Sequence, residues 1–102
     1  MSSYAVLWSE PAEDLEAGKL ELEPVGLRFE GIRGGGAGRV HRVYYDDIHG
    51  VRIGRRPHER IGGKPALVLD LAVGGPLRIG GLNGVGTVTE LAELLAPLTA
   101  RP

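Results

Sequence analysis

The chain contains no cysteine, and this absence excludes both disulfide bonds and metal sites built on thiolates. Residues 1–9 lack the basic segment and apolar run that mark a secretory signal. No apolar run approaches the ~20 residues that a membrane-spanning helix needs. The sequence therefore predicts a cytoplasmic protein without a transmembrane segment.

The chain also lacks a large excess of positive or negative charge, because its formal net charge is −1 at pH 7. Such a balance gives no overall attraction to nucleic acid or to anionic membranes. The most basic stretch, residues 52–64, contains no aromatic side chain on which bases would stack. We therefore expect no nucleic-acid partner. The many glycines, and arginine in place of lysine at most basic positions, are typical of a GC-rich bacterial genome.

Groups that carry catalysis are missing as well. Serine occurs only at Ser2, Ser3 and Ser9, so no serine lies near a histidine in the sequence to form a nucleophilic triad. The three histidines, at positions 41, 49 and 58, do not have the spacing of metal ligands on one element. The glycine-containing segment 81–86 (GLNGVG) lacks the Lys-Ser/Thr pair of a phosphate-binding loop. The sequence predicts a non-catalytic protein with no metal and no cofactor.

What the chain does contain is period-two alternation. Leu20 and Leu22 alternate with charged residues, and after the turn at 24–26 Leu27 and Phe29 continue the pattern, which predicts an antiparallel hairpin over 19–32. Residues 66–73 alternate most clearly. In this stretch Leu67, Leu69, Leu71 and Val73 are expected to face the core, and Ala66, Val68, Asp70 and Ala72 are expected to face outward.

Further short strands are expected at 4–9, 39–45, 48–53 and 77–79. The weak alternation of 39–45 suggests an edge strand or a bulge, and Gly50 suggests a bend or bulge. The pair Gly74-Gly75 predicts a tight turn that needs positive φ. A helix is expected over 88–98, with Thr87 and Glu90 as a capping box and with Pro97 bending or ending it. Its apolar stripe is Val88, Leu91, Leu94, Leu95 and Leu98.

A length of 102 residues indicates a single domain, which we place at 4–98, with short flexible termini at 1–3 and 99–102. Three short motifs occur in this order, followed by a hairpin and a helix: residues 18–22 (GKLEL), 26–29 (GLRF) and 46–48 (DDI). On these motifs and their order, the chain resembles the pleckstrin-homology-like (PH-like) superfamily in its bacterial PH and GRAM-type forms.

The resemblance implies a mainly β (α+β) fold. The implied architecture is a barrel of about seven antiparallel strands in two near-orthogonal sheets, capped by one C-terminal α-helix. In this superfamily many eukaryotic members bind phosphoinositides through basic residues near the first two strands, others bind peptides or proteins, and some bacterial members form oligomers. Here the segment 10–18 between those strands is acidic, which argues against headgroup binding at that place.

Two candidate surfaces follow. Neighbours on a strand face opposite sides, so one ring of the pair Tyr44 and Tyr45 must leave the core. Together with the outward Val68, it would form an exposed, partly apolar face of the kind that contacts proteins. The leading prediction is therefore a protein-binding or self-associating module, with Tyr44, Tyr45 and Val68 as the candidate interaction surface.

The alternative function is binding of an anionic lipid headgroup or phosphate ligand through the basic loop 52–64, because arginine forks suit phosphate. The candidate anion-binding residues are Arg52, Arg55, Arg56, Arg60 and Lys64. This hypothesis requires that the loop is ordered and that it faces the same end of the barrel as another basic group, such as Arg33 or Arg39. A merely solvated loop would have the same composition.

Overall fold

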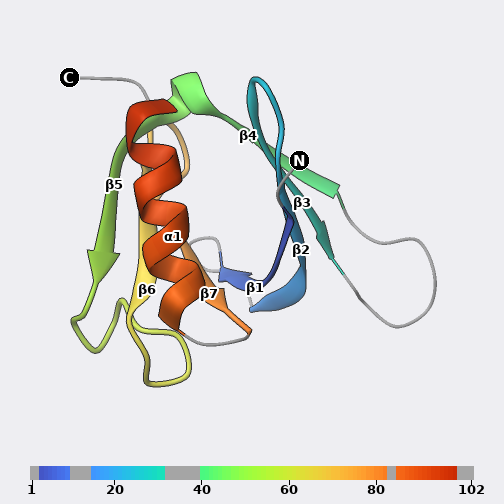
Figure 1. Cartoon of the computed structure of the whole chain (residues 1–102). Coiled ribbons are helices and arrows are strands. Elements are labelled where there is room, and N and C mark those ends of the chain that lie inside the picture. Colours follow the sequence, from blue (N-terminus) through green and yellow to red (C-terminus); the bar gives the residue numbers. More distant parts are fainter. Residues whose placement is uncertain (1–2, 10–14, 32–39, 83–84, 99–102) are drawn as a thin grey trace.

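The computed structural model describes residues 3–9, 15–31, 40–82 and 85–98, and within them the chain is mainly β (Figure 1). The strands are β1 (Ser3–Ser9), β2 (Glu16–Leu22), β3 (Gly26–Gly31), β4 (Val40–Tyr44), β5 (Ile48–Gly54), β6 (Ala66–Leu71) and β7 (Leu77–Gly81). The helix α1 spans Val85–Leu95, and short 3₁₀ turns cover Tyr45–Asp47 and Ala96–Leu98.

All strand pairs are antiparallel and join one sheet in the order β4-β3-β2-β1-β7-β6-β5. The expected seven strands and C-terminal helix are confirmed, but the strands form one curled half-barrel, whereas two sheets were expected. The two halves are continuous because β1 pairs with β2 on one side and with β7 on the other. The sheet therefore ends at two edges, β4 and β5.

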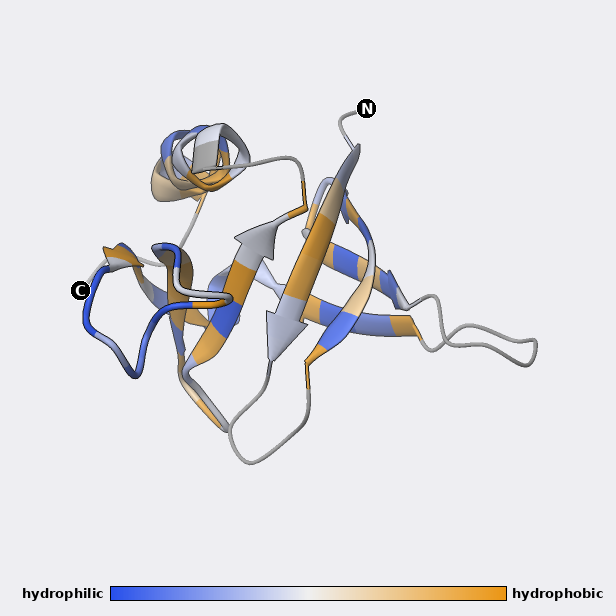
Figure 2. Ribbon diagram, turned by 90° about the horizontal axis from the view of Figure 1, so that it is seen from below, coloured by the Kyte–Doolittle hydropathy of each residue, from blue (hydrophilic) through white to orange (hydrophobic). Residues whose placement is uncertain are grey.

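The hairpin expected over 19–32 is confirmed by β2 and β3, in which Leu20 lies opposite Phe29. Strand β2 begins three residues earlier than expected, at Glu16. Hydrophobic and hydrophilic residues alternate along the strands in Figure 2. Inward side chains of both halves form one core, with the rings of Trp8 and Phe29 5.0 Å apart. The fold is thus held by apolar packing on the concave side of the sheet.

Helix α1 lies across β5, β6 and β7 (Figure 1) and buries Val88, Leu91 and Leu95 completely or nearly so. It begins three residues before the predicted start, so Thr87 lies inside the helix and the predicted capping box is wrong. Leu94 and Leu98, which were expected in the buried stripe, are 39% and 45% exposed, and Leu98 lies beyond the end of α1 in the 3₁₀ turn. Among the described residues, no helix is long and apolar enough to cross a membrane.

The two irregular strands behave as the sequence suggests. Strand β4 is an edge strand, and the register of β5 shifts between Ile48 and Gly50, which confirms the expected bulge. The turn at Gly74 has φ 79°, as predicted. Strand β6 ends at Leu71, however, and Val73 is 87% exposed, so its predicted inward position is wrong. The amide of Ala72 donates to the carbonyl of Asp47 instead of continuing the strand.

Candidate functional site

Loop 55–65, which joins β5 to β6, folds back over the outer face of the sheet. Arg52, Val68 and Arg78 are cross-strand neighbours, so their side chains share this face. Val68 is nevertheless only 1% exposed, which makes its predicted place on an interaction surface wrong. Glu59 covers it: a Cβ added at Gly54 would lie 2.6 Å from Glu59 Cβ and 2.8 Å from Val68 Cγ2.

Polar contacts hold this loop in place. Arg52 donates to the Glu59 carboxylate, which also accepts from the amide of Arg56 at 3.4 Å. Arg78 on β7 donates to the carbonyls of His58 and Arg60 at 3.2 and 3.1 Å. The hydrogen bond from Arg52 is the main reason why the pKa of Glu59 lies below its ordinary value, with the Arg56 amide as a smaller cause. The loop is therefore fixed with its carboxylate ionised.

The five predicted anion-binding residues do not form one free cluster. Arg52 is engaged by Glu59 and lies 3.5 Å from an oxygen of Asp70, and Arg60 donates its Nε–H to the carbonyl of Arg55 at 2.7 Å. The side chains of Arg55, Arg56, Arg60 and Lys64 are exposed and form no ion pair with a carboxylate of the described residues. Arg33 and Arg39, which were expected to complete the site, lie outside the described residues.

Lys64 also lines a cavity of about 190 Å³ beside the first turns of α1. The remaining lining residues are Leu7, Ile61, Gly62, Pro65, Gly80, Gly81, Leu82 and Val88. Most of these side chains are apolar or absent, so the cavity adds no second cation to Lys64. Among the described residues, this region does not gather the positive charge that a phosphate ligand requires.

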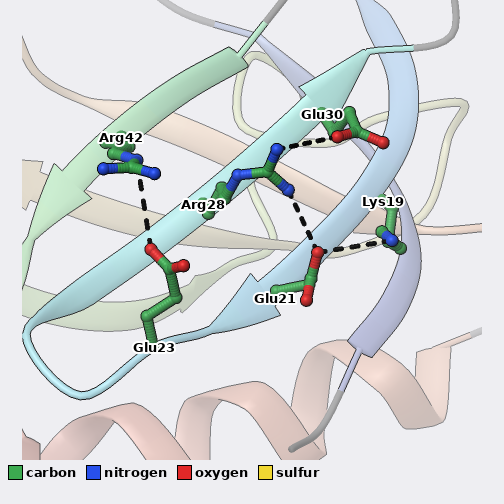
Figure 3. Close-up of polar contacts among 6 residues, drawn as sticks. All are labelled: Lys19, Glu21, Glu23, Arg28, Glu30 and Arg42. Atoms are coloured by element: carbon green, nitrogen blue, oxygen red, sulfur yellow. Dashed lines mark hydrogen bonds and ion pairs between the residues drawn. The ribbon is translucent and has the colours of Figure 1, made fainter.

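The outer face of β2, β3 and β4 carries a ladder of charges that was not predicted from the sequence (Figure 3). Arg28 bridges Glu21 and Glu30 at 3.1 and 2.8 Å, and its pKa is raised, chiefly by the hydrogen bond to Glu30. Lys19 lies 3.3 Å from Glu21. The alternating charges of 19–23 and 28–30 were the available signal, but the strand register was needed to pair them.

The two adjacent tyrosines divide as predicted, with one ring inside and one outside. Tyr45 is 6% exposed, and its hydroxyl donates to the carbonyl of Glu23 at 2.7 Å, so it cannot contribute to an interaction surface as predicted. Burial, and then the charge of Glu23, raise the pKa of its phenol. Tyr44 is 52% exposed at the end of β4. Of the three predicted interaction residues, only Tyr44 remains at the surface.

The backbone of β4 has one side that β3 does not use. Tyr44 pairs with Gly26, and the amide of Tyr45 donates to the carbonyl of Val25 at 3.0 Å. In an antiparallel ladder, this places Tyr44 and Gly26 in a non-hydrogen-bonded pair, and the pattern alternates along the strand. His41 and Val43 therefore bond to β3, while the N–H and C=O groups of Arg42 point away from the sheet, as does the N–H of Tyr44.

A groove of about 190 Å³ runs beside this edge, where the curled sheet stays open between β4 and the end of β6. It is lined by His41, Arg42, Val43, Asp47, Leu71 and Val73. The side chains of Arg42 and Tyr44 lie on the opposite, outer face of the strand. The β4 edge, the exposed Tyr44 and this groove together form the candidate site, which we name the β4 site.

Comparison with known proteins does not assign the chain to a family. No protein-family model matches the chain, and curated proteins give no significant match. Within the described residues, no group of three or more histidine and acidic side chains is arranged to hold a metal ion. His41 instead packs against Phe29, with ring centroids 6.0 Å apart. The curled sheet with its C-terminal helix is compatible with a PH-like fold.

Proposed function

We propose that this chain is a non-catalytic, PH-like binding module that contacts another protein chain through the β4 site. The observation that carries the proposal is Tyr44, a large aromatic side chain that is 52% exposed on the outer face of the edge strand β4. Tyrosine supplies a large contact area at low entropic cost and is enriched in protein interfaces. Val40 on the same strand is 49% exposed and Val25 in the neighbouring turn is 65% exposed, which extends the apolar surface.

The alternative, binding of an anionic headgroup or phosphate through the basic loop, has less support. Arg52 is already neutralised by two carboxylates, and Arg60 is turned toward the backbone of its own loop. The exposed Arg55, Arg56 and Lys64 remain, but solvated loops commonly carry such residues. We therefore rank this function second, and vesicle binding distinguishes it from the first.

Photo-crosslinking in cells of the source organism tests the proposal. A photoreactive phenylalanine analogue replaces Tyr44 in one variant and Glu93 in the control, because Glu93 is exposed on α1 and is not one of the residues of the β4 site. The proposal predicts a covalent adduct with one or a few defined proteins, or with a second copy of the chain, at position 44 only. Equal adducts at both positions, or none at position 44, would contradict it.

A further inference from the structure

The β4 site has the geometry to accept one more strand. We propose that it binds an extended segment of a partner protein by strand addition, and that this segment carries an acidic residue opposite Arg42 between two apolar residues. The inference rests on the proposed function and specifies the partner's chemistry. Strand addition takes its affinity from main-chain hydrogen bonds and its specificity from alternate side chains.

The main-chain groups come from two residues of the edge. Arg42 presents both its N–H and its C=O outward, and Tyr44 presents its N–H, because the ladder to β3 uses the groups of His41 and Val43. These groups are spaced two residues apart, which is the spacing that an incoming strand pairs with. An added strand would extend the sheet beyond β4 and lie along the groove.

The groove determines which residues of the partner segment are apolar. In an added strand, residues opposite His41 and Val43 would face inward, toward the side of β4 that lines the groove. The far wall of the groove is Leu71, which is partly buried, and Val73, which is 87% exposed. Covering these two side chains would remove apolar surface from water, which favours binding.

Arg42 determines where the partner segment carries its acidic residue. Its side chain is 57% exposed, and its carboxylate partner among the described residues is Glu23, at 4.0 Å (Figure 3). The neighbouring Arg28, by contrast, has two carboxylates at 3.1 Å or less. A carboxylate opposite Arg42 would therefore find an arginine with unused donors. Asp47 in the groove disfavours a second acid on the inner face, so the acidic residue belongs on the outer face.

A second copy of this chain fits the site less well. Two β4 strands paired antiparallel about their shared centre place Arg42 directly opposite its own copy. Like charges directly opposite each other destabilise a pair of strands. Charge complementarity thus selects a partner of different sequence, with a carboxylate where this chain has its guanidinium group.

The test is a nuclear magnetic resonance titration with two blocked nine-residue peptides, one alternating valine with glutamate and the other alternating valine with lysine. We expect the glutamate peptide to shift the amide signals of Arg42 and Tyr44 and the methyl signals of Leu71 and Val73, and to bind at least about tenfold more tightly than the lysine peptide. In Arg42→Glu this preference should reverse. Equal affinities for the two peptides, or shifts confined to loop 55–65, would overturn the proposal.

A matched pair of variants isolates the main-chain contribution. Tyr44 has φ −77°, which proline can adopt, and its N–H is not used in the ladder to β3. Tyr44→Pro therefore removes the outward donor, whereas Tyr44→Ala removes only the ring. We expect Tyr44→Pro to bind the glutamate peptide about tenfold more weakly than Tyr44→Ala does. Equal affinities of the two variants would overturn strand addition.

The result for strand addition is separable from that for the proposed function. A defined adduct at position 44 with no binding of the glutamate peptide would leave the β4 site as a protein contact and reject strand addition by an acidic segment. Should Tyr44→Pro fail to fold, the charge reversal in Arg42→Glu still decides the proposal, because Arg42 is exposed and its substitution removes no buried contact.

Discussion

Arg52 on β5 donates a hydrogen bond to the carboxylate of Glu59, and this contact closes loop 55–65 over the outer face of the sheet. The same contact covers Val68, which would otherwise be an exposed valine in the middle of a sheet. It also removes one arginine from the group that seemed available to an anion. This pair thus accounts for the burial of Val68 and for the loss of Arg52 from the basic candidate surface.

The Glu59 contact should depend on pH. Because the folded state lowers the pKa of Glu59 below its ordinary value of 4.5, its stabilising contribution is present above that value and is lost as the pH falls through the folded pKa. Glu59→Gln should therefore be less stable than wild type at pH 7, and this difference should shrink as the pH falls below 4.5. Urea unfolding of both proteins between pH 7 and pH 3 measures it. A difference that does not change with pH would contradict the assignment.

The close packing of loop 55–65 over the sheet can be tested at Gly54. A methyl group there would lie 2.6 Å from Glu59 Cβ and 2.8 Å from Val68 Cγ2, so Gly54→Ala should destabilise the protein by about 1–3 kcal/mol. Gly86 in α1 is the control, since nothing lies within 4 Å of an added Cβ, and Gly86→Ala should stabilise by about 0.5 kcal/mol. Thermal unfolding compares the two, and equal effects would show that the loop does not pack as described.

The hydroxyl of Tyr45 should matter to stability and not to binding. Tyr45→Phe removes the hydrogen bond to the carbonyl of Glu23, at a cost of about 1 kcal/mol at pH 7. Its pKa is raised above 10.0 in the folded state, so the contribution of the neutral phenol is present below pH 10 and is lost as the pH rises through the folded pKa. The stability difference between the two proteins, measured by urea unfolding, should therefore narrow above pH 10. If the difference stays constant to pH 11.5, Tyr45 is not buried as described.

Vesicle flotation decides between the two functions. We expect no salt-sensitive binding to anionic vesicles, because loop 55–65 presents only scattered exposed cations. The matched variant is Arg55→Ala, Arg56→Ala and Lys64→Ala together. Binding of the wild type to anionic but not neutral vesicles at low salt, abolished in this variant, would put the headgroup function first and reject our ranking.

Much of the fold was predictable because alternation with period two identifies strands that have one wet and one dry face. Leu20, Leu27 and Phe29 were therefore placed correctly. The irregular alternation of β4 and the glycine at position 50 each left two alternatives open, and the structure has an edge strand in the first case and a bulge in the second. Val68 was misplaced because alternation describes which face a residue lies on, and not whether a distant loop covers that face.

The candidate site was harder to predict from the sequence than the fold was. Alternation predicts that one of two adjacent tyrosines is exposed, but the choice of Tyr44 depends on the register of β4 against β3. The groove beside β4 depends on where β6 ends and on the turn that brings Val73 near His41. Both features depend on contacts between residues that are far apart in the sequence. Likewise, the pairing of Arg28 with Glu21 follows from strand register and not from local pattern.

Amide hydrogen exchange of the free protein, at a concentration where light scattering gives the mass of a monomer, tests whether the β4 edge is open to a partner. If the edge of β4 is open, the amides of Arg42 and Tyr44 should exchange at nearly unprotected rates, while those of His41 and Val43 are protected by β3. Protection of Arg42 and Tyr44 equal to that of Val43 would mean that the edge is already covered, and would contradict a binding site on β4.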